Sequence, residues 1–313
     1  MVTSATVVKK RSRKGVIYNL IKYRYLYMLL FPGLLYFLVF KYYPMWGVLL
    51  AFKNYQPFLG FWHSQWVGMQ NFNQLFTNFE FLQLIRNTLL LSLYNIVFFF
   101  PAPIIIALLL NEMRKLWFRK ALQTAIYLPH FISIVVVVGI TFDVLTTNGG
   151  VVNHILQQVF GTQIDFLSSP IWFRPIITLQ TMWKETGWST ILFLAALSNV
   201  DVELYDAARV DGAGRWRQMW HVTLPSIRST IVILLILRMG AILNSGFEQI
   251  YLMTNSLNQN VANVFDTYVY FVGLTQGSFS YATAVGLFKA VVGAILIFGS
   301  NYLAKRFGES GIF

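Results

Sequence analysis

Five ionisable side chains fall inside stretches of this 313-residue chain that are otherwise apolar. They are Lys184, Glu185, Arg238, Glu248 and Lys289. A charged group at the centre of a bilayer costs at least ~2.5 kcal/mol on insertion scales, so such groups usually face protein or a water-filled path. The chemistry that suits these residues is therefore the binding of a polar solute through ionic contacts and hydrogen bonds.

Polar and aromatic residues recur at helical spacing around the first two of these groups. Gln180, Lys184 and Trp188 are four residues apart, so a helix over 173–197 places them on one face, with Glu185 beside it. An indole face stacks on C–H surfaces, while amide and charged groups bond hydroxyls. This face is therefore suited to a sugar.

A second polar face is predicted in a helix over 230–252. There Asn244 and Glu248 are one turn apart, as are Ser245 and Gln249. We predict that the two faces line a substrate pathway. The predicted pathway residues are Gln180, Lys184, Glu185, Trp188, Asn244, Glu248 and Gln249. The alternative is that Arg238 or Lys289 pairs with Glu248 between helices, or extends to a membrane interface, and serves assembly alone.

The other reactive residue types form no convincing catalytic or metal site. The four histidines (His63, His130, His154 and His221) are scattered without metal-ligand spacing, and are read as structural or interfacial. The chain has no cysteine and no phosphate-binding loop of the form GxxxxGK[ST], so it lacks the usual means of hydrolysing ATP. We expect no catalytic residue, no metal ligand and no cofactor on this chain.

The elements that position these residues are predicted from composition. With 56% hydrophobic and only 12% charged residues, most of the chain must be solvated by lipid. A bilayer core of about 30 Å needs about 20 apolar residues per helix, whereas a barrel strand needs about 10 of alternating polarity. The apolar runs are long and continuous, so we predict an all-α integral membrane protein with six transmembrane helices. They are expected at 26–49, 88–110, 123–145, 173–197, 230–252 and 282–302.

Charge sets the orientation of these helices. Seventeen of the 24 lysines and arginines fall before the first helix, in the second and fourth connections, or after the sixth helix, so both termini are predicted to be cytoplasmic. This distribution makes a nucleic-acid surface the weaker reading of the net charge of +12. Residues 1–24 form a basic cytoplasmic tail on the membrane lipid, and 25–313 a single transmembrane domain. The uncharged external connections either contact a partner or only join helices.

The connection after the fourth helix, 201–225, is the most charged part of this domain. Asp201 is a plausible N-cap of a first short helix, and Gly212 permits the sharp turn that follows. A second helix from about residue 215 places Trp216, Met219 and Trp220 on one apolar patch and is expected to end at Pro225. Exposed tryptophans are unfavourable in water, so we expect either a partner protein or the lipid headgroups to cover them.

The spacing within this connection resembles a known motif. Asp206-Ala207-Ala208, three residues, Gly212, nine residues and then VTLP resemble the EAA loop of permease subunits in binding-protein-dependent ABC importers, with Asp for Glu and Val for Ile as the two departures. In that family the loop forms coupling helices that sit in a groove of an ATPase subunit. The resemblance implies this contact for Asp206, Ala207, Ala208 and Gly212, and we add Trp216, Met219 and Trp220.

The resemblance extends over nearly the whole chain, including NTLLLSLYNIVFFFPAPIIIALLLNEMR and YLPHFIS, and points to the polysaccharide branch of the carbohydrate permeases. It implies oligosaccharide import across a bacterial cytoplasmic (inner) membrane. It also implies a second homologous permease, an ATPase dimer that binds the ATP and magnesium, and an extracytoplasmic sugar-binding protein. Three intramembrane cations against two anions favour an acidic, uronate-containing oligosaccharide.

Two other function classes remain open from the residues alone. An ion-coupled sugar carrier would often show internal repeats and helices broken by glycine or proline, and neither is evident in the sequence. A polytopic sugar-transferring membrane enzyme would need a cluster of carboxylates or histidines at one interface, which the sequence does not indicate.

Overall fold

The computed structural model describes Tyr18, residues 21–308 and residues 311–312. The chain divides into two units, Met1–Leu50 and Ala51–Phe313. Most of the basic tail predicted at 1–24 lies outside the described residues. The helix α2 (Arg24–Phe37) continues through the π-turn η1 (Leu38–Tyr42) and the 3₁₀ helix η2 (Tyr43–Phe52). This stretch is long and apolar enough to cross a membrane.

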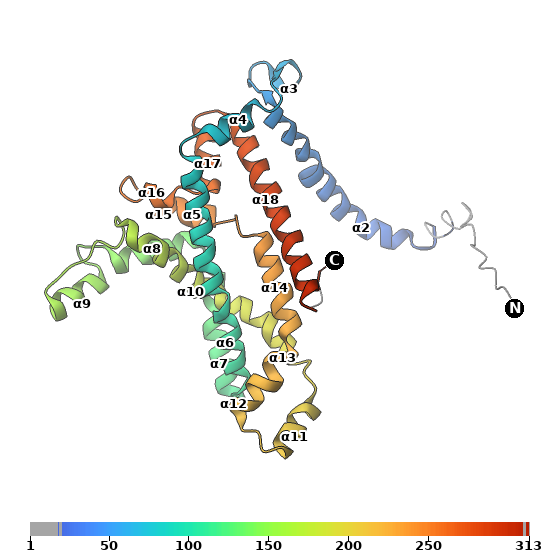
Figure 1. Cartoon of the computed structure of the whole chain (residues 1–313), viewed down its shortest axis with the longest axis vertical. Coiled ribbons are helices and arrows are strands. Elements are labelled where there is room, and N and C mark those ends of the chain that lie inside the picture. Colours follow the sequence, from blue (N-terminus) through green and yellow to red (C-terminus); the bar gives the residue numbers. More distant parts are fainter. Residues whose placement is uncertain (1–17, 19–20, 309–310, 313) are drawn as a thin grey trace. The chain divides into compact units, whose positions relative to one another are not determined.

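The second unit is almost entirely helical, with one two-residue antiparallel strand pair (Figure 1). The strands β1 and β2 pair Lys53 with Trp66. The elements are β1 (Lys53–Asn54), α3 (Gly60–His63), β2 (Gln65–Trp66), α4 (Gln70–Thr77), α5 (Phe81–Tyr94), η3 (Asn95–Phe99), α6 (Pro101–Asn111), α7 (Leu116–Tyr127), η4 (Leu128–Phe131), α8 (Ile134–Leu145), α9 (Val151–Phe160), α10 (Pro170–Leu197), α11 (Val202–Val210), α12 (Arg215–Gln218), η5 (Met219–Thr223), α13 (Leu224–Ser226), α14 (Arg228–Gly240), α15 (Phe247–Met253), α16 (Gln259–Ala262), α17 (Phe265–Tyr270), η6 (Phe271–Thr275) and α18 (Phe279–Arg306).

Among the described residues, three helical stretches are long and apolar enough to span a bilayer: Arg24–Phe52, Phe81–Asn111 and Phe279–Arg306. Two bent pairs raise the number to five if each pair is one span. The predicted span 173–197 lies within α10, a continuous 28-residue helix that carries charges near its middle. The helical class of the fold is therefore confirmed, and the apolar helices fit a membrane protein.

The predicted third helix, 123–145, is not continuous. α7 and η4 (Leu116–Phe131) meet α8 at an angle of 99°. The chain is extended at Ile132 and Ser133, and the Ser133 hydroxyl caps the new helix by accepting from the Val136 amide. Pro129 removes one backbone donor just before this corner, which favours a break at this point.

The predicted fifth helix, 230–252, is interrupted as well. α14 ends at Gly240 and α15 begins at Phe247, with a turn and irregular backbone between them. Gly246 has φ of +79°, a left-handed conformation that a Cβ disfavours. Helix breaks at proline and glycine, which were not evident in the sequence, therefore occur beside Pro129 and at Gly246. It follows that Asn244 and Glu248, like Ser245 and Gln249, are not one turn apart on a single helix.

The long helix α10 is the centre of packing in the second unit. One core cluster joins it to α5, α8 and α15 through Leu91, Val138, Ile177 and Ile250. A second joins it to α6 and α14 through Ala107, Phe193 and Ile227. A third cluster packs α17 and α18 against α4 and α5. The charges of α10 are thereby held in one fixed orientation.

Gly187 of α10 marks the closest approach in this packing. A Cβ at this position would lie 2.0 Å from the Ile126 carbonyl oxygen of α7, and backbone cannot yield as a flexible side chain can. We expect Gly187→Ala to lower stability by about 1–3 kcal/mol through overpacking, seen as a lower midpoint of thermal unfolding in detergent. Gly139→Ala in α8, where a Cβ meets nothing within 4 Å, is the matched control. Equal midpoints for the two variants would contradict this account.

Candidate functional site

The predicted coupling connection is a helical hairpin formed by α11 and α12. The Asp201 carboxylate accepts from the Glu203 amide at 2.9 Å, which confirms the predicted N-cap. Gly212 has φ of +74°, and the Ala213 amide donates to the Ala208 carbonyl at 2.9 Å, so the glycine makes the predicted turn. The hairpin lies at one end of the second unit, away from α3 and α4 at the other end (Figure 1).

Two side-chain contacts hold the hairpin closed. The Tyr205 hydroxyl of α11 lies 3.0 Å from the buried Thr223 hydroxyl, and the Gln218 amide donates to the Ala213 carbonyl at 2.7 Å. Pro225 was expected to end the second helix, but helical backbone continues through it to Ser226. Proline is tolerated in the first turn of α13, and the axis bends by 57° only between Ser226 and Arg228.

The outer surface of the hairpin carries most of the residues predicted for the coupling contact. Trp216 is 71% and Trp220 59% exposed, while Met219 is half-buried beneath them. Asp206 is exposed and pairs with Arg209 at 2.7 Å; Ala207 is exposed and Ala208 half-buried. Uncovered indoles on a rigid hairpin form a surface suited to docking in a partner's groove.

The predicted pathway residues converge on a cavity of about 360 Å³. It lies where α10, the end of α14 and the start of α15 meet. Five of the seven predicted residues line it: Lys184, Glu185, Asn244, Glu248 and Gln249. The lining also includes Ser245, which lies on the second predicted polar face, and Arg238, one of the five intramembrane charges. Its other residues were not predicted to line the pathway: Asn95, Ile134, Thr181, Gly246 and Phe247. Among the described residues, the buried side-chain amide oxygen of Asn95 and the Ser245 hydroxyl have no hydrogen-bond partner.

A charged cluster forms one wall of this cavity. Lys184 Nζ lies 3.2 Å from Glu185 Oε1 and donates to the His130 carbonyl at 2.7 Å. His130 Nδ1 is 2.9 Å from Glu185 Oε2, and its ring stacks on Trp188 with centroids 4.5 Å apart. His130 thus positions Glu185, a role that the sequence did not indicate. Trp188 gives one indole face to His130 and does not line the cavity.

The remaining predicted pathway residue, Gln180, has a structural position. It is buried, donates to the Thr141 hydroxyl at 2.7 Å and accepts from Gln249 at 2.8 Å. Gln249 also donates to the Ile177 carbonyl at 2.9 Å. These hydrogen bonds hold α8 and α15 against α10. Gln180 therefore stabilises the helices that form the cavity without lining it.

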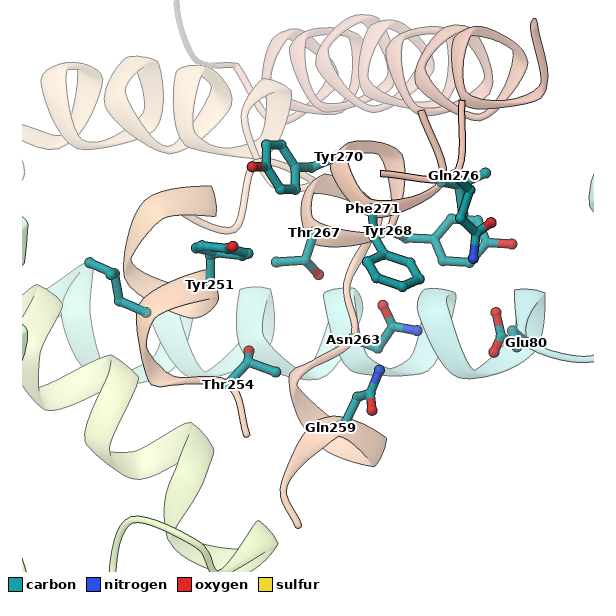
Figure 2. A pocket seen from close by; sticks show the side chains of 12 residues that line it. Glu80, Tyr251, Thr254, Gln259, Asn263, Thr267, Tyr268, Tyr270, Phe271 and Gln276 are labelled. Atoms are coloured by element: carbon teal, nitrogen blue, oxygen red, sulfur yellow. The ribbon is translucent and has the colours of Figure 1, made fainter. Parts of the chain in front are cut away.

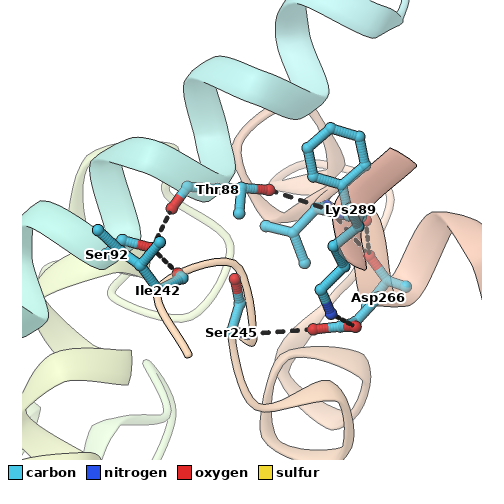
Figure 3. Close-up of polar contacts among 9 residues, drawn as sticks. Thr88, Ser92, Ile242, Ser245, Asp266 and Lys289 are labelled. Atoms are coloured by element: carbon cyan, nitrogen blue, oxygen red, sulfur yellow. Dashed lines mark hydrogen bonds and ion pairs between the residues drawn. The ribbon is translucent and has the colours of Figure 1, made fainter. Parts of the chain in front are cut away.

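The interhelical ion pairs of Glu248 with Arg238 or Lys289, which were the alternative to a pathway role, are not formed in the described part of the chain. Lys289 of α18 pairs instead with Asp266 of α17, whose other oxygen accepts from the Ser245 amide at 3.1 Å (Figure 3). Ser92 of α5 donates to the Ile242 carbonyl in the same segment (Figure 3). The interruption between α14 and α15 is thereby anchored at both ends. Arg238 lies over the Phe99 ring at 5.0 Å.

Apolar helices that hold charges around an internal cavity, with a rigid hairpin exposed at one end, define a membrane transport subunit. The family model of binding-protein-dependent transport system inner membrane components matches residues 99–309, and the chain belongs to this family. It is therefore a permease subunit of an ABC importer, which sets aside the membrane-enzyme alternative.

Individual relatives match most of the chain. Protein LplB of Bacillus subtilis (strain 168) is 62% identical over 93% of this chain and 91% of its own length. The polygalacturonan/rhamnogalacturonan transport system permease protein YteP of the same organism is 54% identical over 99% and 96%. The crystal structure of a bacterial alginate ABC transporter with an alginate pentasaccharide-bound periplasmic protein contains a chain 40% identical to this one. The match has a TM-score of 0.86 and covers 94% of this chain and 98% of that one.

Proposed function

We propose that this permease carries an acidic oligosaccharide, and that the cavity bounded by Lys184, Glu185, Arg238 and Glu248 is its binding site in the membrane. The observation that supports this proposal is the convergence of these charges in one space with Asn244 and with Asn95, whose side-chain oxygen has no partner among the described residues. Uncompensated polar atoms are costly in a dry site, and a hydroxyl-rich solute would satisfy them.

One cation of the cavity is available to an acidic solute. Lys184 is neutralised by Glu185, whereas Arg238, like the carboxylate Glu248 in the same lining, has no ion-pair partner among the described residues. A guanidinium binds a carboxylate through two parallel hydrogen bonds, so a uronate could pair with Arg238. The relatives described above include transporters of polygalacturonan and of alginate, both acidic polysaccharides, which agrees with this choice.

The proposed assembly follows the family resemblance. A second homologous permease would complete the pathway, an ATPase dimer would hold the α11–α12 hairpins and bind ATP and magnesium, and an extracytoplasmic protein would deliver the sugar. The six spans would be α2–η2, α5–α6, α7–α8, α10, α14–α15 and α18, in a bacterial inner membrane with both termini inside. Closure of the ATPase dimer would draw the hairpins together and turn the helices outward.

Reconstitution tests this assignment against an ion-coupled carrier. Vesicles containing this chain with its co-expressed permease, ATPase and binding protein are expected to accumulate labelled oligogalacturonate only when ATP is supplied on the hairpin side. Vesicles containing this chain alone should show no uptake under a proton or sodium gradient. Gradient-driven uptake by the chain alone would contradict the proposal, because the hairpin would then have no energetic role.

A further inference from the structure

A second cavity, of about 510 Å³, lies among α5, α15, α16, α17 and η6, in the region 254–281 predicted to face outside (Figure 2). Its volume falls in the range of small-molecule pockets, 300–1,000 Å³. None of the predicted pathway residues lines it. The lining residues are Glu80, Tyr251, Leu252, Thr254, Gln259, Asn263, Thr267, Tyr268, Tyr270, Phe271, Val272 and Gln276.

The groups that this cavity offers are amides and aromatic faces. The side-chain amides of Gln259, Asn263 and Gln276 form no hydrogen bond within the part of the chain that the structure describes, and Figure 2 shows the first two on the same side of the cavity as Phe271. The rings of Tyr251 and Phe271 are 51% and 50% exposed. Three available amides and two half-exposed rings match what a sugar ring presents, namely hydroxyls at its edge and C–H groups on its face.

Two further residues define the charge of the cavity. Among the described residues that line it, Glu80 is the only carboxylate, and none is a lysine, arginine or histidine. Burial raises the pKa of the Tyr268 phenol, and its hydrogen bond with Tyr281 raises it further, so this hydroxyl stays neutral. A carboxylate on a solute would find no cation here and one like charge. The cavity therefore favours the hydroxyls of a saccharide over its acid groups.

An aromatic cluster connects this cavity with the charged one. Phe247, which lines the charged cavity, lies 5.5 Å from Tyr251 and 4.9 Å from Tyr270, centroid to centroid. Tyr251 and Tyr270 line the outer cavity and are 5.3 Å apart. The three rings therefore form an unbroken aromatic connection between the two cavities. A sugar ring that moves along them would make many weak dispersion contacts, none of which holds it strongly.

We propose that the outer cavity is a saccharide subsite through which the oligosaccharide passes before it reaches Lys184 and Arg238. Tyr251 and Phe271 would stack on pyranose faces, and Gln259, Asn263 and Gln276 would bond ring hydroxyls. This inference rests on the function proposed above and adds an entry site that selects for hydroxyls where the inner cavity selects for charge.

Because the chain has no cysteine, a single introduced thiol reports on this cavity in the complete importer. Gln259→Cys should react with a small extracellular maleimide, and saturating oligogalacturonate should slow this reaction at least fivefold. Carboxyl-reduced oligogalacturonate should protect equally well. Thr162→Cys, at an exposed position in the connection between α9 and α10, is the control and should not be protected. Unchanged labelling of Gln259→Cys with both saccharides would overturn the proposal.

Uptake kinetics provide a second test of the proposed subsite, one that needs no introduced cysteine. Phe271→Ala should raise the saccharide concentration for half-maximal ATP-dependent uptake at least fivefold with little change in the maximal rate, whereas Phe160→Ala, an exposed phenylalanine of α9, should not. If Phe271→Ala instead reduces co-purification of the binding protein or the second permease, the cavity is a protein contact and the subsite is refuted. Absence of saccharide uptake by the unmodified importer would instead refute the proposed function.

Discussion

Replacing both Trp216 and Trp220 with alanine is expected to reduce ATP-dependent saccharide uptake at least tenfold while leaving membrane insertion intact. The two indoles project from a hairpin that its own contacts hold closed, so their loss should not unfold α11 or α12. Covering two largely exposed indoles at about 25 cal/mol per Å² contributes on the order of 3 kcal/mol, roughly a hundredfold in affinity for an ATPase groove. The measurements are uptake in vesicles and the amount of ATPase that co-purifies.

The same experiment separates a protein groove from lipid headgroups as the cover of these indoles. Trp62→Ala, an equally exposed tryptophan of α3 at the other end of the second unit, is the matched control and should leave ATPase co-purification unchanged. If the double alanine variant retains its ATPase and its uptake, the hairpin surface is not the coupling contact. Its tryptophans would then be anchors in the headgroup layer.

The hairpin could be predicted residue by residue because its signals are local. A cap is recognised from Asp201 and the helix after it, and a left-handed turn from Gly212, without knowledge of any distant residue. The predicted end of the second helix at Pro225 was wrong by one residue, because a proline in the first turn of a helix does not stop it. The prediction worked where sequence neighbours determine the geometry.

The two helix interruptions could not be predicted in this way. The polar residues at the breaks, Ser133 in the first and Asn244-Ser245-Gly246 in the second, are too few to change the mean hydropathy, so 123–145 and 230–252 resemble unbroken spans. What stabilises the second interruption is supplied from elsewhere in the chain: Ser92 bonds Ile242 across 150 residues, and Asp266 receives the Ser245 amide. The spacing of side chains along the sequence does not reveal such distant partners. The continuous helical register assumed for 244–249 was therefore wrong.

The charged cavity was nevertheless largely located from the sequence. A charge in an apolar stretch is costly to expose to lipid. Lys184, Glu185 and Glu248 are therefore expected to share one polar space even where the backbone between them is not a continuous helix. Asn95, a lone amide in the apolar run 88–110, was an available signal that the sequence reasoning did not use. The pairing of His130 with Glu185 had no signal, since 55 residues separate them.

Arg238→Gln is expected to lower uptake of oligogalacturonate at least tenfold relative to the unmodified importer, while uptake of the same oligosaccharide with its carboxyls reduced to alcohols changes less than twofold. The reason is that a hydrogen bond to a charged group contributes about 1.5–3 kcal/mol, and the variant removes the cavity's cation that has no carboxylate partner among the described residues. Expressing each saccharide's uptake as a ratio to the unmodified importer cancels any preference of the binding protein.

Arg238→Lys is the control, since it keeps the positive charge without the planar fork, and it should retain most of the discrimination between the two saccharides at reduced affinity. The stacking of Arg238 on Phe99 allows a purely structural role as well, and the ratio distinguishes the two. A structural role would lower uptake of the acidic and the reduced saccharide to the same extent and would lower the thermal midpoint. That outcome would remove the physical basis for an acidic substrate, because Lys184 is already neutralised by Glu185 and the remaining groups of the cavity wall would attract no carboxylate.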